Sequence, residues 1–157
     1  MKTVEGVLDG RGLKVSLVAA RFNETIVERL LEGACRALRQ HGVEEASIQQ
    51  VWVPGCFEVP VAVAELIDQG GWDAVVALGA VIRGATPHFE YVSEAVSSGI
   101  AALSTRRFPI GFGVLTVNSV QQAEERAGGK LGNKGFDAAQ SALEMVSVLR
   151  QLRADRP

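Results

Sequence analysis

The feature that most constrains the fold of this chain is an uncharged apolar run, Ala-Val-Val-Ala-Leu-Gly-Ala-Val-Ile, at residues 74–82. The run is far too short to cross a bilayer as a helix. It also lacks the alternation of polar and apolar residues that marks a strand with one face in water. Continuous runs of this kind are typical of strands in a parallel sheet that helices cover on both faces. We therefore predict a buried central strand at 74–82.

The segments around this run predict a regular alternation of strands and helices. Three more strands are expected at residues 13–20, 47–53 and 110–117. Apolar residues recur at helical spacing between them, and glycines or prolines punctuate the patterns. The expected helices lie at 24–41, 60–68, 89–104, 119–127 and 136–153, with a frayed tail from about 153 to 157. This order predicts one domain over residues 1–157, a three-layer α/β/α sandwich with a four-stranded, parallel, flavodoxin-like sheet.

Composition and charge exclude several classes of function. Lys and Arg number 16 and Asp and Glu number 18, for a net charge of −2. This balance lacks the basic surface of a nucleic-acid-binding protein and the basic patch of a membrane-bound one. The N-terminal residues contain no apolar signal region, so a cytoplasmic location is expected. Cys35 and Cys56 do not form a disulfide framework, and no metal-binding motif is found.

Candidate ligand-binding residues follow from the predicted fold, because such sheets bind ligands beyond the carboxyl ends of their strands. The loops at those ends are 21–23, 54–58, 83–88 and 117–119. Asn23 is expected to cap the helix that follows the first of these loops. Phe22 is either a hydrophobic staple for the next helix or a stacking face for a planar ring. Glu58 is either a carboxylate that favours a helix start or an acceptor for ligand hydroxyls. Cys56 is expected to be a small apolar neighbour rather than a nucleophile.

The third of these loops, Arg83–His88, has the most informative chemistry. Gly84 lies in a turn before a predicted helix, and backbone N–H groups in such a turn form an anion site. Thr86 is expected to cap the helix and to contact a phosphate. His88 is either a proton carrier near neutral pH or a solvated residue at the helix start.

Three cations, Arg126, Lys130 and Lys134, lie around a glycine-rich segment late in the chain. One interpretation is that they stabilise the C-terminal end of a helix, where positive charge is favourable. The other is that they bind phosphate, which an arginine can grip with two hydrogen bonds.

Five segments of the chain together share the pattern of one enzyme family. They are Ala20–Asn23, Trp52–Pro60, Ala77–Val92, Phe112–Thr116 and Glu125–Gly135. Each is modest alone, but they occur in order and at matching spacing over nearly the whole chain. On these residues the chain resembles the 6,7-dimethyl-8-ribityllumazine synthase family.

The resemblance implies a cofactor-free condensation of two small molecules, 5-amino-6-(D-ribitylamino)uracil and 3,4-dihydroxy-2-butanone 4-phosphate. The products would be 6,7-dimethyl-8-ribityllumazine, phosphate and water, in the penultimate step of riboflavin biosynthesis. The resemblance also implies self-association into pentamers, and the compact segment at 128–135 favours their closure into an icosahedral shell. Riboflavin synthase is a further partner that it suggests.

The resemblance further implies a role for each site residue. Phe22 would stack on the pyrimidine, and His88 would shuttle protons. The pyrimidine and ribityl site would be lined by Cys56, Phe57, Glu58, Ala80, Val81 and Ile82. The phosphate would be held by Ala85, Thr86 and Arg126. A neighbouring subunit would supply Phe112, Arg126 and Lys134.

Two site positions depart from the commonest family pattern: Cys56 replaces a frequent Ala, and Ala80 a frequent Thr. Neither belongs to the expected proton or phosphate groups.

Two other functions stay open, a flavodoxin-like module that binds a flavin or lumazine without catalysis and a purely structural shell subunit. A phosphorelay receiver domain is disfavoured, because it needs an acidic cluster where Ala20 and Phe22 stand.

Overall fold

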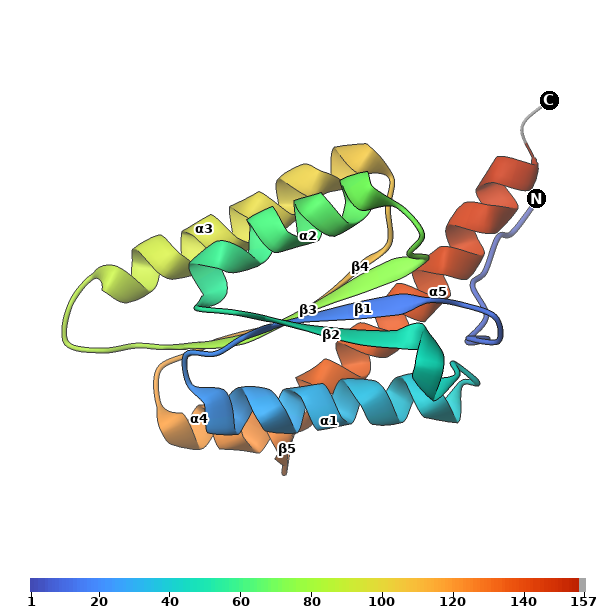
Figure 1. Ribbon diagram of the computed structural model, residues 1–157. Helices are drawn as coiled ribbons and strands as arrows, with labels where there is room; N and C mark the ends of the chain where they lie inside the picture. The colour runs from blue at the N-terminus through green and yellow to red at the C-terminus, as the bar shows by residue number, and fades with distance from the viewer. Residues whose placement is uncertain (156–157) are drawn as a thin grey trace.

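The computed structural model describes residues 1–155 and has three layers, with a parallel sheet between two layers of helices (Figure 1). The strands are β1 (Val15–Ala20), β2 (Ile48–Val53), β3 (Ala74–Ile82) and β4 (Ile110–Val117), in the order β2-β1-β3-β4. All three pairings are parallel. The predicted four-stranded α/β/α sandwich is therefore confirmed, and β3 has the predicted bounds.

The helices divide between the two faces of the sheet (Figure 1). One face is covered by α1 (Glu24–Gln40), the short α4 (Val120–Arg126) and α5 (Lys134–Ala154), and the other by α2 (Val59–Gln69) and α3 (His88–Ala102). Short 3₁₀ helices occur at Glu45–Ser47, Cys56–Glu58 and Leu103–Arg106. None of the helices in residues 1–155 has the length and apolar character that a membrane crossing requires.

The core has two parts, one on each face of the sheet. Residues 74–81 of β3 are buried because helices cover both of its faces. The apolar residues of α1 point at the sheet with helical spacing and are buried: Ile26, Val27, Leu30, Leu31, Ala34, Ala37 and Leu38. Burial of a large apolar side chain contributes roughly 1.5–3 kcal/mol, so this stripe fixes α1 on the sheet.

The last third of the chain differs in detail from the sequence-based expectation. The glycine-rich segment forms a small antiparallel hairpin of β5 (Ala127–Gly129) and β6 (Gly132–Asn133) rather than a simple kink. The Asn133 side chain caps α5 by accepting a 3.0 Å hydrogen bond from the Phe136 N–H, so α5 begins at Lys134. The helix continues to Ala154, where a frayed tail was expected, and residues 156–157 lie outside the described part of the chain.

The β3 strand extends past its neighbour β1, and this difference in length creates the site. The last paired residues are Ala19 of β1 and Leu78 of β3, whereas β3 pairs with β4 as far as Ile82. Ala80–Ile82 therefore present one edge of β3 beyond the end of β1. Loops that follow β1, β2 and β3 surround this edge, as expected for the carboxyl ends of parallel strands.

Candidate active site

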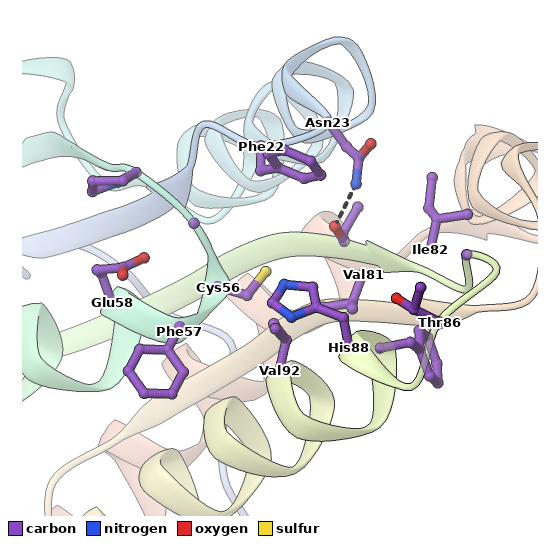
Figure 2. Close-up of a pocket in the computed structure, with 15 residues that line it drawn as sticks. Phe22, Asn23, Cys56, Phe57, Glu58, Val81, Ile82, Thr86, His88 and Val92 are labelled. Carbon is purple, nitrogen blue, oxygen red and sulfur yellow. Dashed lines mark hydrogen bonds between the residues drawn. The ribbon is translucent and has the colours of Figure 1, made fainter.

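A cavity of about 490 Å³ lies at the carboxyl ends of the strands (Figure 2). This volume is in the range of small-molecule binding sites. The residues that line it are Phe22, Asn23, Pro54, Gly55, Cys56, Phe57, Glu58, Ala80, Val81, Ile82, Gly84, Thr86, His88, Phe89 and Val92. They come from the last residues of β3, from the loops after β1, β2 and β3 and from the first turns of α3, so three of the four predicted loops meet here.

Phe22 lies in the loop between β1 and α1 with 74% of its surface exposed. The hydrophobic-staple interpretation is wrong, because a staple would pack this ring against the helix. The loop itself is well held: the Arg21 and Phe22 N–H groups donate to the carbonyls of Val53 and Pro54, at 2.8 and 3.1 Å. The ring therefore offers an open aromatic face to the cavity (Figure 2).

Asn23 does not cap α1 through its side chain, as its sequence position suggested. It adopts a left-handed backbone conformation, with φ 61° and ψ 43°. Its Nδ2 instead donates a 2.8 Å hydrogen bond to the carbonyl of Ala80, across the edge of β3 (Figure 2). Sequence reasoning missed this contact, since the pairing spans 57 positions of the chain.

The loop after β2 places Cys56, Phe57 and Glu58 on a single 3₁₀ turn at the start of α2. Phe57 is 64% exposed, whereas Glu58 is half-buried and makes no side-chain cap, so its carboxylate is available to hydroxyl groups of a ligand. Cys56 is buried, and burial raises the pKa of its thiol to about 11. The thiol stays protonated at neutral pH, which agrees with the small neighbour that the sequence predicts.

Cys56 packs directly against the middle of β3. A Cβ at Gly79 would lie 2.4 Å from the Cys56 Sγ, so this thiol occupies the space that the glycine leaves free. The Ala80 N–H donates a hydrogen bond to the same sulfur. Because Asn23 already binds the Ala80 carbonyl, both backbone polar groups of Ala80 have partners within the chain.

The turn from β3 to α3 is the place where the sequence predicts an anion site. Residues 83–88 are exposed, and α3 begins at His88 after Pro87 in the N-cap position. Thr86 lines the cavity but does not cap the helix, so that part of the prediction is wrong. The first N–H groups of a helix lack partners within the helix and attract anions. Gly84 and Thr86 line the cavity beside them, whereas Ala85 does not.

Arg83 fixes this turn from the outside. Its Nε donates a 2.9 Å hydrogen bond to the Asn118 Oδ1, and its Nη1 pairs with Glu90 in the first turn of α3. The guanidinium also lies 4.3 Å from the centre of the Phe89 ring. Arg83 holds the pKa of the Glu90 carboxyl below its usual value, so this negative charge at the helix start is matched by a positive one.

Four of the residues that were expected in the site do not line the cavity of this chain, although all lie in the described residues: Ala85, Phe112, Arg126 and Lys134. Phe112 is 44% exposed on β4. Lys134 at the start of α5 pairs with Asp137 at 2.9 Å. Phe112, Arg126 and Lys134 are the three groups for which a neighbouring subunit was expected.

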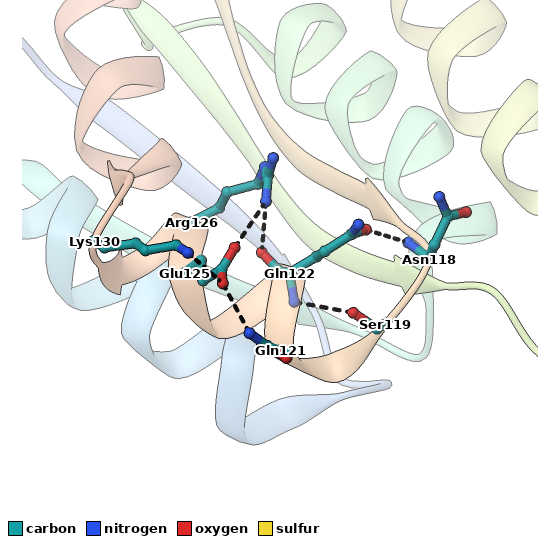
Figure 3. A network of polar contacts seen from close by, with 7 residues as sticks. All are labelled: Asn118, Ser119, Gln121, Gln122, Glu125, Arg126 and Lys130. Carbon is teal, nitrogen blue, oxygen red and sulfur yellow. Dashed lines mark hydrogen bonds and ion pairs between the residues drawn. The ribbon is translucent and has the colours of Figure 1, made fainter.

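Arg126 ends α4 and belongs to a polar network with Glu125 and Lys130 (Figure 3). Its Nη1 donates to the Gln122 carbonyl at 3.1 Å and lies 3.7 Å from a Glu125 carboxylate oxygen. Lys130 binds the other oxygen of Glu125 at 3.1 Å, and this contact is the main reason that the pKa of Glu125 is lowered. Arg126 thus lies at the C-terminal end of a helix, where positive charge is favourable, and its side chain is one-third exposed.

The family model for 6,7-dimethyl-8-ribityllumazine synthase matches residues 12–150, which is most of the chain. The chain belongs to this lumazine synthase family. It is therefore an enzyme, a transferase of lumazine synthesis in riboflavin biosynthesis. The match extends from the turn before β1 into the last turns of α5, so it includes all the segments that line the cavity.

The two departures from the lumazine synthase pattern fit this structure without disturbing the cavity. Cys56 places its sulfur in space next to Gly79, away from solvent. Ala80 is buried and uses its backbone groups to bind Asn23 and Cys56. Within residues 1–155, no group of three or more His, Cys, Asp and Glu side chains is arranged to hold a metal ion.

Proposed function

We propose that the protein condenses 5-amino-6-(D-ribitylamino)uracil with 3,4-dihydroxy-2-butanone 4-phosphate to give 6,7-dimethyl-8-ribityllumazine, phosphate and water. This would be the penultimate step of riboflavin biosynthesis. The observation that carries the proposal is that one cavity joins an open aromatic ring, a free carboxylate and a helix-start anion site in a chain of this family. These groups match the planar ring, the hydroxyl-rich ribityl chain and the phosphate of the two substrates.

The pyrimidine substrate would lie between the loops after β1 and β2. Phe22 offers its ring for stacking, and Glu58 accepts hydrogen bonds from the ribityl hydroxyls. Cys56, Phe57, Ala80 and Val81 would form the walls. Arg83 N–H donates to the Val117 carbonyl on the β4 side. Successive residues of a strand direct their polar groups to opposite edges, so Ile82 turns its N–H and C=O to the open edge, where a pyrimidine can bind them.

The phosphate substrate would lie against the turn at 84–86, with Ala85 and Thr86 and the first N–H groups of α3 around its phosphate. His88 begins the same helix and lines the cavity, so it stands beside the position from which phosphate leaves. The amine of the pyrimidine attacks the ketone without an enzyme nucleophile. The protein's contribution would be to hold both substrates together and to move protons through His88.

A second subunit would complete the site. Phe112, Arg126 and Lys134 do not line the cavity of their own chain. Phe112 and Lys134 are exposed and the Arg126 side chain is one-third exposed, so all three can contribute to the cavity of a neighbour. We therefore propose a cytoplasmic homo-oligomer built of pentamers, closed into an icosahedral shell, with riboflavin synthase as a further partner. The oligomer would bring the Arg126 guanidinium to the phosphate site.

The direct test mixes the purified protein with both substrates and follows lumazine fluorescence together with phosphate release. Because the substrate amine is reactive by itself, each rate is compared with a protein-free sample. We expect faster formation of lumazine and phosphate in equal amounts, with saturation in both substrates. Binding of the pyrimidine without turnover would favour the flavodoxin-like binding module instead. Assembly with neither binding nor turnover would favour the purely structural subunit.

A further inference from the structure

The segment Arg21–Asn23 is held on both sides by parts of the chain that are far apart in sequence. On one side, the backbone N–H groups of Arg21 and Phe22 donate to the carbonyls of Val53, the last residue of β2, and of Pro54, at 2.8 and 3.1 Å. On the other side, the Asn23 amide donates to the Ala80 carbonyl of β3 at 2.8 Å. Phe22 stands between these two supports. Its ring is 74% exposed, so side-chain packing within the chain does little to fix its position.

Asn23 meets two requirements that few residues meet together. Its φ of 61° lies in the left-handed region, which Asn enters more easily than most non-glycine residues. Within residues 1–155, the other non-glycine residue with a positive φ is Arg107. The position also needs a short side-chain donor, because Ala80 extends beyond the end of β1 and its carbonyl has no strand partner there. Glycine satisfies the first requirement alone.

We infer that Asn23 is a positioning residue that sets the Phe22 ring for stacking on the pyrimidine substrate; this inference rests on the proposed function. The Asn23 hydrogen bond anchors the turn to β3, and the rigid turn holds the ring over the cavity. Without the bond, the turn loses its attachment to β3 and keeps those to β2 and, through the Asn23 carbonyl, to the Ile26 and Val27 N–H groups of α1. The ring then samples positions from which it cannot stack. The effect falls on pyrimidine binding, since the phosphate turn at 84–88 makes no contact through Asn23.

The main test compares Asn23→Gly with Arg107→Gly. Both substitutions put glycine at a left-handed position, so both keep the backbone conformation, and Arg107 lies far along the chain after α3. Calorimetry measures binding of 5-amino-6-(D-ribitylamino)uracil alone. A neutral hydrogen bond supports a change of roughly two- to tenfold, so Asn23→Gly should weaken the Kd by about that factor. Arg107→Gly should not change it, and the KM for the butanone phosphate should stay within about twofold in both.

A double-mutant cycle shows whether Asn23 acts through Phe22. In a Phe22→Ala background, the positioning effect has no ring on which to act, so Asn23→Gly should cost less than about twofold in pyrimidine affinity. Equal losses in both backgrounds would overturn the inference and would instead indicate a direct contact between Asn23 and the ligand. Unchanged affinity of Asn23→Gly in the native background would also overturn it.

A measurement without substrate separates this inference from the proposed function. 4-Fluorophenylalanine at position 22 reports ring motion through its ¹⁹F line width, and Asn23→Gly should change this signal whereas Arg107→Gly should not. If the native protein binds no pyrimidine, the proposed function fails; the changed ¹⁹F signal would then still support positioning of the ring by Asn23. If the native protein binds pyrimidine but the signal is the same in all three proteins, the positioning inference fails alone.

Discussion

The Arg126→Ala substitution tests the phosphate half of the proposed site most directly. The Arg126 guanidinium binds the Gln122 carbonyl and lies 3.7 Å from Glu125 in its own chain. Within the described residues, these contacts engage only part of the N–H donors of a guanidinium. The rest are available to a phosphate. Loss of a charge-assisted contact costs about 1.5–3 kcal/mol, which corresponds to a roughly 10- to 100-fold higher KM for the butanone phosphate.

The assay varies each substrate in turn at saturating levels of the other. The KM for the pyrimidine should change by less than about threefold, because Arg126 is assigned to the phosphate alone. Lys130→Ala is the matched control, because Lys130 also binds Glu125 and its substitution removes one positive charge from the same network. Its KM values should stay near those of the native protein. An equal rise for both substrates in Arg126→Ala would refute the phosphate assignment.

The same variant tests whether Arg126 acts in a neighbouring subunit. Arg126→Ala chains are mixed with His88→Ala chains, unfolded and reassembled together. If each cavity takes its arginine from one neighbour in a ring, random mixing gives about a quarter of the cavities both native groups. Activity at low butanone phosphate should then exceed the average of the two separate variants. Activity equal to that average would place Arg126 and His88 in the same chain's site.

Three further predictions concern the proton carrier, the assembly and the buried thiol. His88→Ala should lower kcat by roughly ten- to a hundredfold with near-normal KM values. Wild-type turnover of this variant across the pH range would show that His88 does not carry protons in the reaction. Light scattering should find an oligomer of at least five chains, whereas a fully active monomer would contradict the shared site. The raised Cys56 pKa of about 11, against an ordinary value of 9.0, predicts slow iodoacetamide labelling of folded protein at pH 8. It also predicts a free energy of unfolding, measured by urea unfolding, that falls as pH rises between these values. Because burial raises the pKa of Cys35 as well, both experiments use a Cys35→Ala background, in which Cys56→Ala should abolish the labelling and this fall in stability.

The sequence was sufficient for the elements whose signal is local. Residues 74–82 were predicted as a buried strand because continuous uncharged apolar runs are typical of strands that helices cover on both faces. Strand β3 has the predicted bounds. The loops at the strand ends followed from the same pattern, and they brought Phe22, Glu58 and His88 to one cavity. The family pattern was also readable, and the match over residues 12–150 confirmed it.

The failures have different causes, and in the first of them the deciding partner lies far along the chain. Asn23 looked like a helix cap because its neighbours predict a helix start, but its amide is taken by a carbonyl 57 positions away. Thr86 was expected to cap α3, but Pro87 takes the N-cap position. The glycine-rich segment became a hairpin through pairing of Ala127 with Asn133, a contact that composition does not indicate.

The contact between Cys56 and Gly79 restricts the order in which mutations can accumulate in a lineage. While Cys56 is present, a methyl group at position 79 would lie 2.4 Å from its sulfur, which leaves no room for Ala. Once Cys56 has changed to Ala, the nearest neighbours of that methyl group would be Ala20 and Val114, at 3.4 and 3.7 Å, which is ordinary packing. Evolution can therefore reach an Ala at 79 by one route, with position 56 changing first, and the reverse order passes through an overpacked core.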